Sequence, residues 1–107
     1  RIRYQAQNRI AMPVFGFAIA DLQGRIVHGN NTQIEKTEIP FVEGRGELQL
    51  QLERLPLAPG GYLLSFSIHS SDHQANYHRL DHAYSIQVTG GKAVDGVCYI
   101  ASKWSHT

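Results

Sequence analysis

The chain has 107 residues, with ten Lys and Arg against nine Asp and Glu, and a formal net charge of +1. These charges are interspersed, which excludes the basic patch expected of a protein that binds nucleic acid or an anionic membrane surface. The longest apolar stretches, such as residues 14–20, are far shorter than the roughly twenty residues of a membrane span, so we predict one soluble domain. Cys98 is the single cysteine, so no internal disulfide can form, as is typical of a reducing compartment. The chain does not begin with Met and shows no signal peptide, and we interpret it as the C-terminal part of a larger chain.

The first half of the chain alternates between apolar and polar residues with the period of a β-strand. Ile2, Tyr4 and Ala6 alternate with polar neighbours. The stretch "PVFGFAIADLQGRIVHG" predicts two short strands around residues 21–24, where a Gln-Gly pair supplies the turn. The stretch "ELQLQLERL", residues 47–55, predicts a strand with leucines on its buried face and Gln49 and Gln51 on its wet face.

Proline and glycine at residues 56–61 then break the chain. The stretch "GYLLSFSIH" predicts a strand with Tyr62 on its apolar face and with Ser65, Ser67 and His69 on its polar face. Residues 82–88 predict another strand, and residues 97–102 a last one that leads to Trp104.

About seven short strands with turn signals between them predict an all-β fold, an antiparallel β-sandwich of the immunoglobulin-like or jelly-roll kind. The prediction covers residues 1–107 as a single domain. No segment shows a helical stripe. The best helical candidate is a turn or two in the histidine stretch, which Ser71 or Asp72 could cap.

That stretch, "IHSSDHQANYHRLDH", holds four of the six histidines. His69 with His73, and His78 with His82, have the i, i+4 spacing that aligns metal ligands on a helix. Here His69 closes a strand and His82 opens one, and four residues along a strand separate side chains by roughly 13 Å. We therefore expect no metal site and no other cofactor, and we interpret the stretch as a polar connecting loop.

Motifs for catalysis are missing from the sequence. There is no GxSxG nucleophile elbow, and "GGKAVDG" lacks the spacing of a phosphate-binding loop. Cys98 lies in an apolar stretch without a partner cysteine, which predicts a small buried hydrophobic residue. We expect no catalytic residue and no enzyme activity.

A binding or assembly surface remains. Gln49, Gln51, Ser67 and His69 would present neutral hydrogen-bonding groups on wet strand faces, which suits a polyhydroxylated neutral ligand. An aromatic side chain can pack against the apolar face of a sugar ring, and Tyr77, Tyr99 and Trp104 are candidates.

The order of the motifs resembles the C-terminal polysaccharide-binding domain of the ATPase subunits of O-antigen ABC transporters, the Wzt type. The resemblance runs from Pro13 to Trp104. It rests on four stretches: "PVFGFAIADLQGRIVHGNNT", "LPLAPGGYLLSFSIHS", "NYHRLDHAYSIQV" and "GVCYIASKW". Taken singly, Phe15, Asp21, Gly24 and Pro59 are most simply turn and packing residues, and Tyr62 a core residue.

The resemblance implies a β-sandwich fused behind a nucleotide-binding domain in the bacterial cytoplasm, at the inner face of the inner membrane through the transporter. Such domains recognise lipid-linked O-antigen polysaccharide, often at its non-reducing end, and license its export in lipopolysaccharide biosynthesis. It also implies a homodimer that exchanges the terminal strand, here residues 97–102. We expect the chain to begin after the first strand or two of the family, which would leave a sheet edge open.

From these observations we predict a non-catalytic carbohydrate-binding module. The predicted carbohydrate-binding residues are Gln49, Gln51, Ser67, His69, Tyr77, His78 and Trp104. Their amide, hydroxyl and imidazole groups would bond sugar hydroxyls and their aromatic rings would stack on sugar rings. The alternative is a dimerisation module of the ATPase subunit without glycan specificity of its own.

Overall fold

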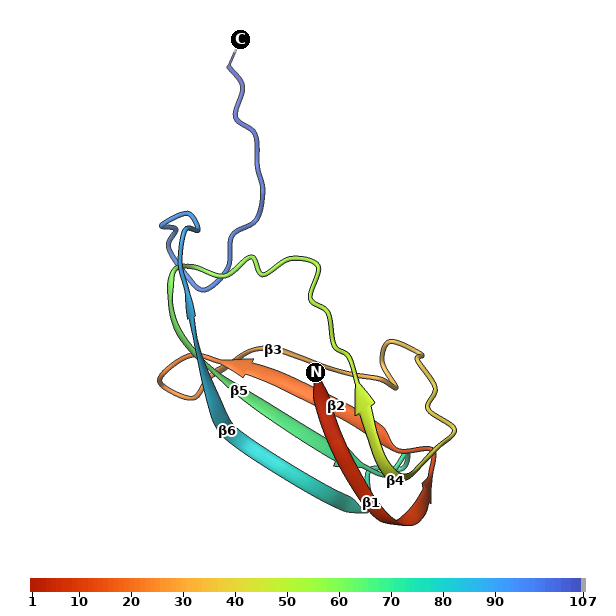
Figure 1. Ribbon diagram of the computed structural model, residues 1–107. Helices are drawn as coiled ribbons and strands as arrows, with labels where there is room; N and C mark the ends of the chain where they lie inside the picture. The colour runs from red at the N-terminus through yellow and green to blue at the C-terminus, as the bar shows by residue number, and fades with distance from the viewer. Residues whose placement is uncertain (107) are drawn as a thin grey trace.

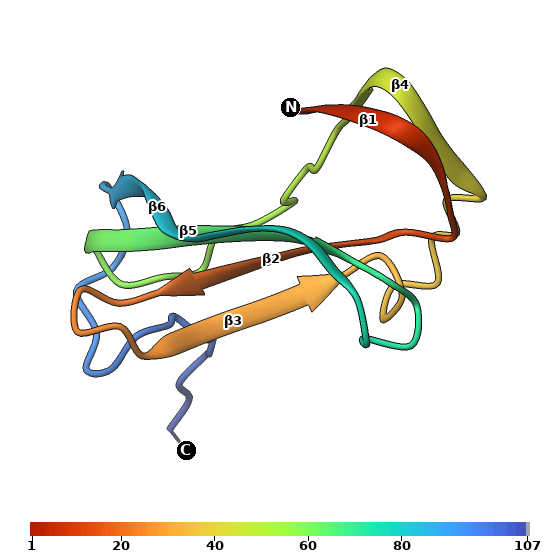
Figure 2. The ribbon, with the colours of Figure 1, turned by 90° about the horizontal axis from the view of Figure 1, so that it is seen from below.

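The computed structural model describes residues 1–106, which form two antiparallel sheets and no helix, hence none able to span a membrane. The small sheet pairs β1 (Ile2–Ala11) with β4 (Phe41–Leu48). The large sheet has the order β3-β2-β5-β6, with β2 (Val14–Ala20), β3 (Ile26–Asn31), β5 (Gly60–His69) and β6 (Asn76–Val88). Figures 1 and 2 show the small sheet arching over one end of the large sheet. The predicted all-β sandwich is confirmed.

Two small apolar clusters hold the layers together, one at each end of the large sheet. Under the small sheet, Phe15 of β2 packs with Ala6 and Val42 from β1 and β4. At the other end, Ile19 of β2 packs with Tyr62 and with Leu57 of the β4–β5 connection. Strand β2 contributes to both clusters because it is an inner strand of the large sheet.

The turn between β2 and β3 is organised by Asp21, which is 8% exposed. Its carboxylate accepts hydrogen bonds from the backbone N–H groups of Gln23 at 3.0 Å and Arg25 at 2.9 Å, and from Arg25 Nε at 2.9 Å. Gly24 closes the turn with a φ of 88°, a left-handed conformation that favours glycine. The predicted hairpin is therefore confirmed, and Asp21 has the structural role that its place in the turn predicted.

Tyr62 is a core residue, as expected. It is 5% exposed, and its hydroxyl donates a hydrogen bond of 2.6 Å to the backbone carbonyl of Ala58, four residues upstream. This bond satisfies the one polar atom of a buried aromatic ring and ties the β4–β5 connection to β5.

The strand predicted over residues 47–55 is wrong beyond Leu48. The pairing of β1 with β4 ends at Ile2 and Leu48, and β4 ends there. Residues 49–56 form a connection instead, and Leu50 and Leu52 are 40% and 43% exposed. Gln49 and Gln51 therefore do not lie on a sheet.

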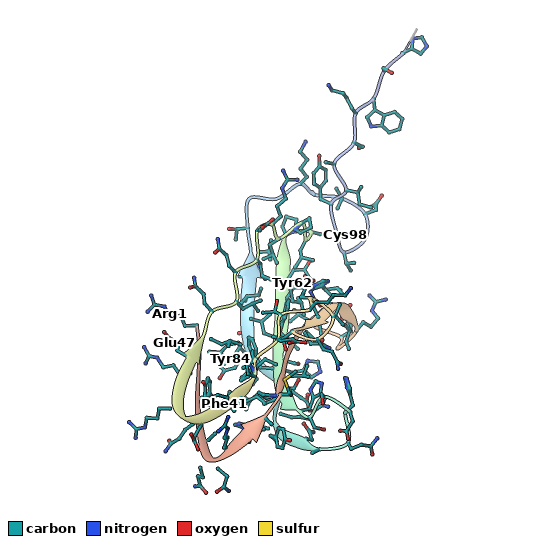
Figure 3. The ribbon with its side chains drawn as sticks, turned by 90° about the vertical axis from the view of Figure 1, so that its right-hand side faces the viewer. Arg1, Phe41, Glu47, Tyr62, Tyr84 and Cys98 are labelled. Carbon is teal, nitrogen blue, oxygen red and sulfur yellow. The ribbon has the colours of Figure 1, made fainter. Side chains whose placement is uncertain are left out.

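The strand predicted over residues 97–102 is also wrong. This segment pairs with the rest of the described chain through one isolated antiparallel bridge, between Leu57 and Cys98. The residues that follow extend away from the sheets (Figure 1). Cys98 is exposed rather than buried, and Figure 3 places it where this segment leaves the body. The extension gives a radius of gyration of 16.9 Å, above the roughly 13 Å of a compact domain of this length.

The histidine stretch is more ordered than predicted. Strand β6 already begins at Asn76, so Tyr77, His78 and His82 are strand residues and only residues 70–75 connect β5 to β6. His73 takes a φ of 62° in this connection, which is a turn; the connecting loop was expected, and the helical candidate in this stretch is not formed. The described part of the chain thus has six strands where about seven were predicted.

A packing test of the small sheet is the substitution Gly46→Ala. A Cβ at Gly46 would overlap the phenol ring of Tyr4, which packs on Phe15 with 5.8 Å between ring centroids. We expect the free energy of unfolding, measured with urea, to fall by about 1–3 kcal/mol. Arg45→Ala is the neighbouring control. In a Tyr4→Ala background Gly46→Ala should cost almost nothing, and an undiminished cost there would contradict the proposed overlap.

A second test concerns acid stability. The pKa of Asp21 is lowered from its ordinary value of 3.8, chiefly by the hydrogen bond from the Arg25 backbone N–H and further by the Arg25 side chain and the Gln23 N–H, against an opposing effect of burial. The stabilisation is fully present above pH 3.8 and is lost as the pH falls through the lower folded-state pKa. Asp21→Asn should therefore lower the melting temperature at pH 7 and flatten its dependence on pH below about 4. The melting temperatures would be measured by circular dichroism. If they fell equally with pH below about 4 in the unaltered protein and in Asp21→Asn, this role of Asp21 would be ruled out.

Candidate functional site

The outer face of the large sheet carries a groove with a floor of small side chains. Strand pairing aligns Gly29 of β3 with Ala18 of β2, and Ala18 with Ser65 of β5. The adjacent row crosses all four strands through Asn31, Gly16, Ser67 and Arg79. Directly paired residues project to the same side of a sheet, so both rows line one surface.

The alternation along β2 explains why this floor is low. Phe15 and Ile19 point to the inner face, where they are 5% and 2% exposed, so Gly16 and Ala18 point outward. A Cβ at Gly16 would lie 2.8 Å from the hydroxyl oxygen of Ser67. Glycine at this position therefore leaves room for the Ser67 hydroxyl in the floor.

Larger residues form the sides of the groove, which encloses about 270 Å³. Asn31, at the end of β3, and Ile34, in the turn that follows, lie on one side. Arg79 and Asp81 of β6 lie on the other. The volume is slightly below the roughly 300–1,000 Å³ of typical small-molecule sites, so the groove suits a small ligand or the end of a larger one.

The polar groups of the groove keep bonding capacity for a ligand. Arg79 Nη2 lies 3.0 Å from Asp81 Oδ1, and both side chains are 57% exposed. Such an exposed pair adds little stability but presents donors and acceptors side by side. The hydroxyl of Ser65 accepts a 2.8 Å hydrogen bond from the His82 backbone N–H, which leaves the Ser65 proton available to donate.

Two turns meet next to the groove residue His69. Gln33, in the turn after β3, donates from Nε2 to the Ser71 carbonyl at 3.0 Å. Its Oε1 lies 2.8 Å from His73 Nε2, and because a carbonyl oxygen only accepts, His73 must donate from this nitrogen. These bonds link segments about forty residues apart in sequence.

His69 lies beneath this link. Its ring packs on the ring of His73, with 4.4 Å between centroids. His69 Nε2 is buried and has no hydrogen-bond partner. Burial lowers the pKa of His69 from its ordinary value of 6.5, and the positive charges of His73 and Arg79 lower it further. His69 is therefore neutral near pH 7.

The separation of roughly 13 Å expected between His69 and His73 is wrong, because the turn after β5 reverses the chain and brings the rings together. Even so, residues 1–106 contain no group of three His, Cys, Asp or Glu side chains arranged to hold a metal ion. His69 lines the groove and His73 packs against it, and the described residues around them form no metal centre.

Tyr77 and His78 lie in a different place. They line a hollow of about 570 Å³ between the free edges of β1 and β6, together with Gln5 and Gln7 of β1 and Phe66 of β5. His78 pairs with Ile68 and so faces the inner side of the sheet, opposite to His69.

The remaining predicted residues are dispersed. Gln49 lines a third hollow of about 310 Å³ near Leu48 and Leu50. Gln51 is exposed on the β4–β5 connection, and Trp104 is 96% exposed on the C-terminal segment. Among the seven predicted binding residues, only Ser67 and His69 line the groove.

The sequence matches one protein family over nearly its whole length. The family model described as the Wzt C-terminal domain covers residues 1–100. The chain belongs to the Wzt C-terminal domain family. The resemblance expected from the motifs is thus confirmed.

A solved structure shares the fold of this Wzt-type domain. The structure titled "Crystal structure of the C-terminal domain of wzt" matches with a TM-score of 0.82 and 23% sequence identity. The match covers 94% of this chain and 64% of that one, so the chain spans under two thirds of its structural relative. A search of curated proteins found no match.

Several residues of the groove in this Wzt-type domain were missed by sequence reasoning. Gly29, Asn31, Arg79 and Asp81 lie on strands other than the one that carries Ser67 and His69. Arg79 could have been found from the stretch "NYHRLDH", where polar and apolar residues alternate at the start of β6. Gly29 and Asn31 join the groove only through the pairing of β3 with β2.

The state of His69 can be tested by NMR titration of its ring protons. We expect a pKa below 6.5, and we expect His73→Gln to raise it because one neighbouring positive charge is removed. Since the unfolded chain takes up the proton first, folding stability should fall as the pH drops below about 6.5 toward the folded-state pKa. His69→Gln should lack this part of the pH dependence. A pKa of His69 at or above 6.5 would contradict the burial described here.

Proposed function

We propose that this protein is a non-catalytic carbohydrate-binding module that recognises the end of an O-antigen polysaccharide. The observation that carries the proposal is the groove on the outer face of the large sheet, in a chain of the Wzt C-terminal domain family. A groove of about 270 Å³ has room for few sugar units, so it suits the end of a polymer rather than a long stretch of it.

The chemistry of the groove supports a hydroxyl-rich ligand. Ser65, Ser67 and Asn31 are neutral donors and acceptors. Arg79 and Asp81 stand side by side at 3.0 Å, so the donors of one and the acceptors of the other can bond neighbouring hydroxyls of one sugar. Ile34, which is 64% exposed, offers an apolar surface to the C–H face of a sugar ring.

Aromatic stacking plays a smaller part in this proposal than the sequence suggested. Tyr77 is 44% exposed, but it lines the hollow between β1 and β6. Trp104 lies on the C-terminal segment. We therefore place the terminal sugar in the groove and assign Tyr77 and His78 to a separate surface that more distant parts of the polymer can reach.

The proposed setting follows from the family. The module would act in the bacterial cytoplasm, at the inner face of the inner membrane, as part of the ATPase subunit of an ABC transporter. Binding of a completed polysaccharide would then mark it for export by the membrane subunit. No cofactor enters this mechanism, because reversible hydrogen bonding and apolar contact are sufficient.

A second candidate function is assembly of a homodimer. The C-terminal segment exposes Ile100 and Trp104, which are 78% and 96% exposed, and is paired to the body by the bridge at Cys98. An exposed apolar segment beside open sheet edges can pair with a second copy by exchange. In this alternative the segment joins two ATPase subunits and glycan specificity resides elsewhere.

The proposal predicts the effect of Arg79→Ala on binding of O-polysaccharide isolated from the strain that encodes the protein. The substitution removes a charged hydrogen-bond donor from the groove, so affinity measured by calorimetry should fall by about 1.5–3 kcal/mol. Arg45→Ala is the matched control, because Arg45 is an exposed residue of β4 on the other sheet and lines neither the groove nor the hollow between β1 and β6, so its loss should leave affinity unchanged. The same polymer without its terminal sugar should bind weakly to the unaltered protein.

Two results would favour the assembly function instead. One is that affinity for the polysaccharide is unchanged both in the Arg79→Ala variant and in a double variant that carries Tyr77→Ala and His78→Ala. The other is loss of a dimer, measured by light scattering, on truncation before Val97 in a protein that binds no polysaccharide.

A further inference from the structure

One glycine of the groove has no structural reason to be glycine. All ten glycines lie within the described residues, and nine have a reason in the backbone or in packing. Five have a φ in the left-handed region, namely Gly24, Gly44, Gly60, Gly90 and Gly96. At four others a Cβ would lie within 3.4 Å of a neighbouring atom, namely Gly16, Gly46, Gly61 and Gly91. Gly29 belongs to neither set.

The surroundings of Gly29 would accept a side chain. Its φ lies outside the left-handed region, and the nearest atom to an added Cβ is the Phe17 carbonyl oxygen at 3.9 Å, an ordinary van der Waals distance. Gly29 lies inside β3, and glycine weakens a strand because it costs more conformational entropy and packs nothing. Glycine inside a strand often marks a bulge, a tight bend or a place where another molecule approaches the backbone closely. The register shift of β3 lies at residues 26–28, whereas Gly29 is in regular register with Ala18, which favours the third reading.

The position of Gly29 shows where that molecule would lie. Gly29 pairs with Ala18 and shares the outer face with it, so a Cβ at this position would project into the groove. Strand β3 is at the edge of the large sheet, so its backbone groups that point away from β2 have no strand partner in the described chain. These groups and the side chain of Asn31 can bond a ligand resting on the strand.

We propose that Gly29 is a ligand-contact position, where a sugar ring lies flat against the backbone of β3 and β2. This inference rests on the proposed function and specifies it. The ring would sit over Gly29 and Ala18, with its hydroxyls directed toward Ser65 on one side and Asn31 on the other. Glycine determines specificity here by setting the depth of the groove, so a bulky substituent on the face toward the sheet is excluded.

The test uses the full-length protein and its O-polysaccharide, with Gly29→Ala and Gly29→Val. Each added carbon fills ligand space without displacing protein atoms, so affinity should fall by about tenfold for alanine and about a hundredfold for valine. The melting temperature should stay equal or rise, because alanine and valine suit a strand better than glycine. Ala11→Val is the control, since it adds two carbons to an exposed strand position on the small sheet and creates a valine there as well.

The outcomes are distinct. Saturable binding by the unaltered protein and by Ala11→Val, with weak binding by a stable Gly29→Val, supports the inference. Equal affinity of the unaltered protein and Gly29→Val overturns it and leaves the proposed function in place. A lowered melting temperature of Gly29→Ala also overturns it, because the strand itself would then need the glycine. Absence of binding by the unaltered protein overturns both proposals.

Discussion

The register between β2 and β5 is the constraint on which the rest of the structure depends. It sets Phe15 opposite Ile68 and Gly16 opposite Ser67 along the same pair of strands. Because side chains alternate between the faces of a sheet, this single alignment places the apolar pair toward the small sheet and the small polar pair toward the outer groove. A slip of β5 by one residue would bury its serines and expose Phe66 and Ile68. Core and groove are therefore two consequences of one pairing.

The core that this register creates is small. Eight hydrophobic residues of the described chain are buried, and six of them form two clusters of three because the small sheet covers only one end of the large one. The second cluster is closed by the β4–β5 connection through Leu57, held in place by the hydrogen bond from Tyr62 to Ala58. The C-terminal segment meets the body at this same connection, through the bridge from Leu57 to Cys98. The C-terminal segment and the second cluster are thus physically connected through Leu57.

The groove differs from a stacking site because its floor is backbone and small side chains. For the sugar ligand that we propose, affinity would come from hydrogen bonds and from close contact with the sheet rather than from an aromatic platform. Hydrogen bonds to a hydroxyl-rich ligand discriminate strongly, because a missing partner leaves a desolvated polar group. The link between Gln33 and His73 lies beside the groove residue His69, whose buried Nε2 has no hydrogen-bond partner and whose pKa is lowered by burial. Modest affinity with high selectivity is the behaviour that such a site favours.

The sequence by itself determined the strand periodicity of β1, β2, β3 and β5, the hairpin turn at Asp21 and the core position of Tyr62, because each depends on alternation or turn chemistry within a few residues. The order of its motifs also determined the family. Tertiary structure alone decided where β4 ends, that residues 97–102 form no strand within this chain, and that His69 meets His73, because each depends on whether a partner lies beside the segment in space. It also decided the site. Ser67 and His69 were predictable from one strand, whereas Gly29, Asn31 and Arg79 join them only through pairing across four strands, and local pattern carries no information about which strands become neighbours.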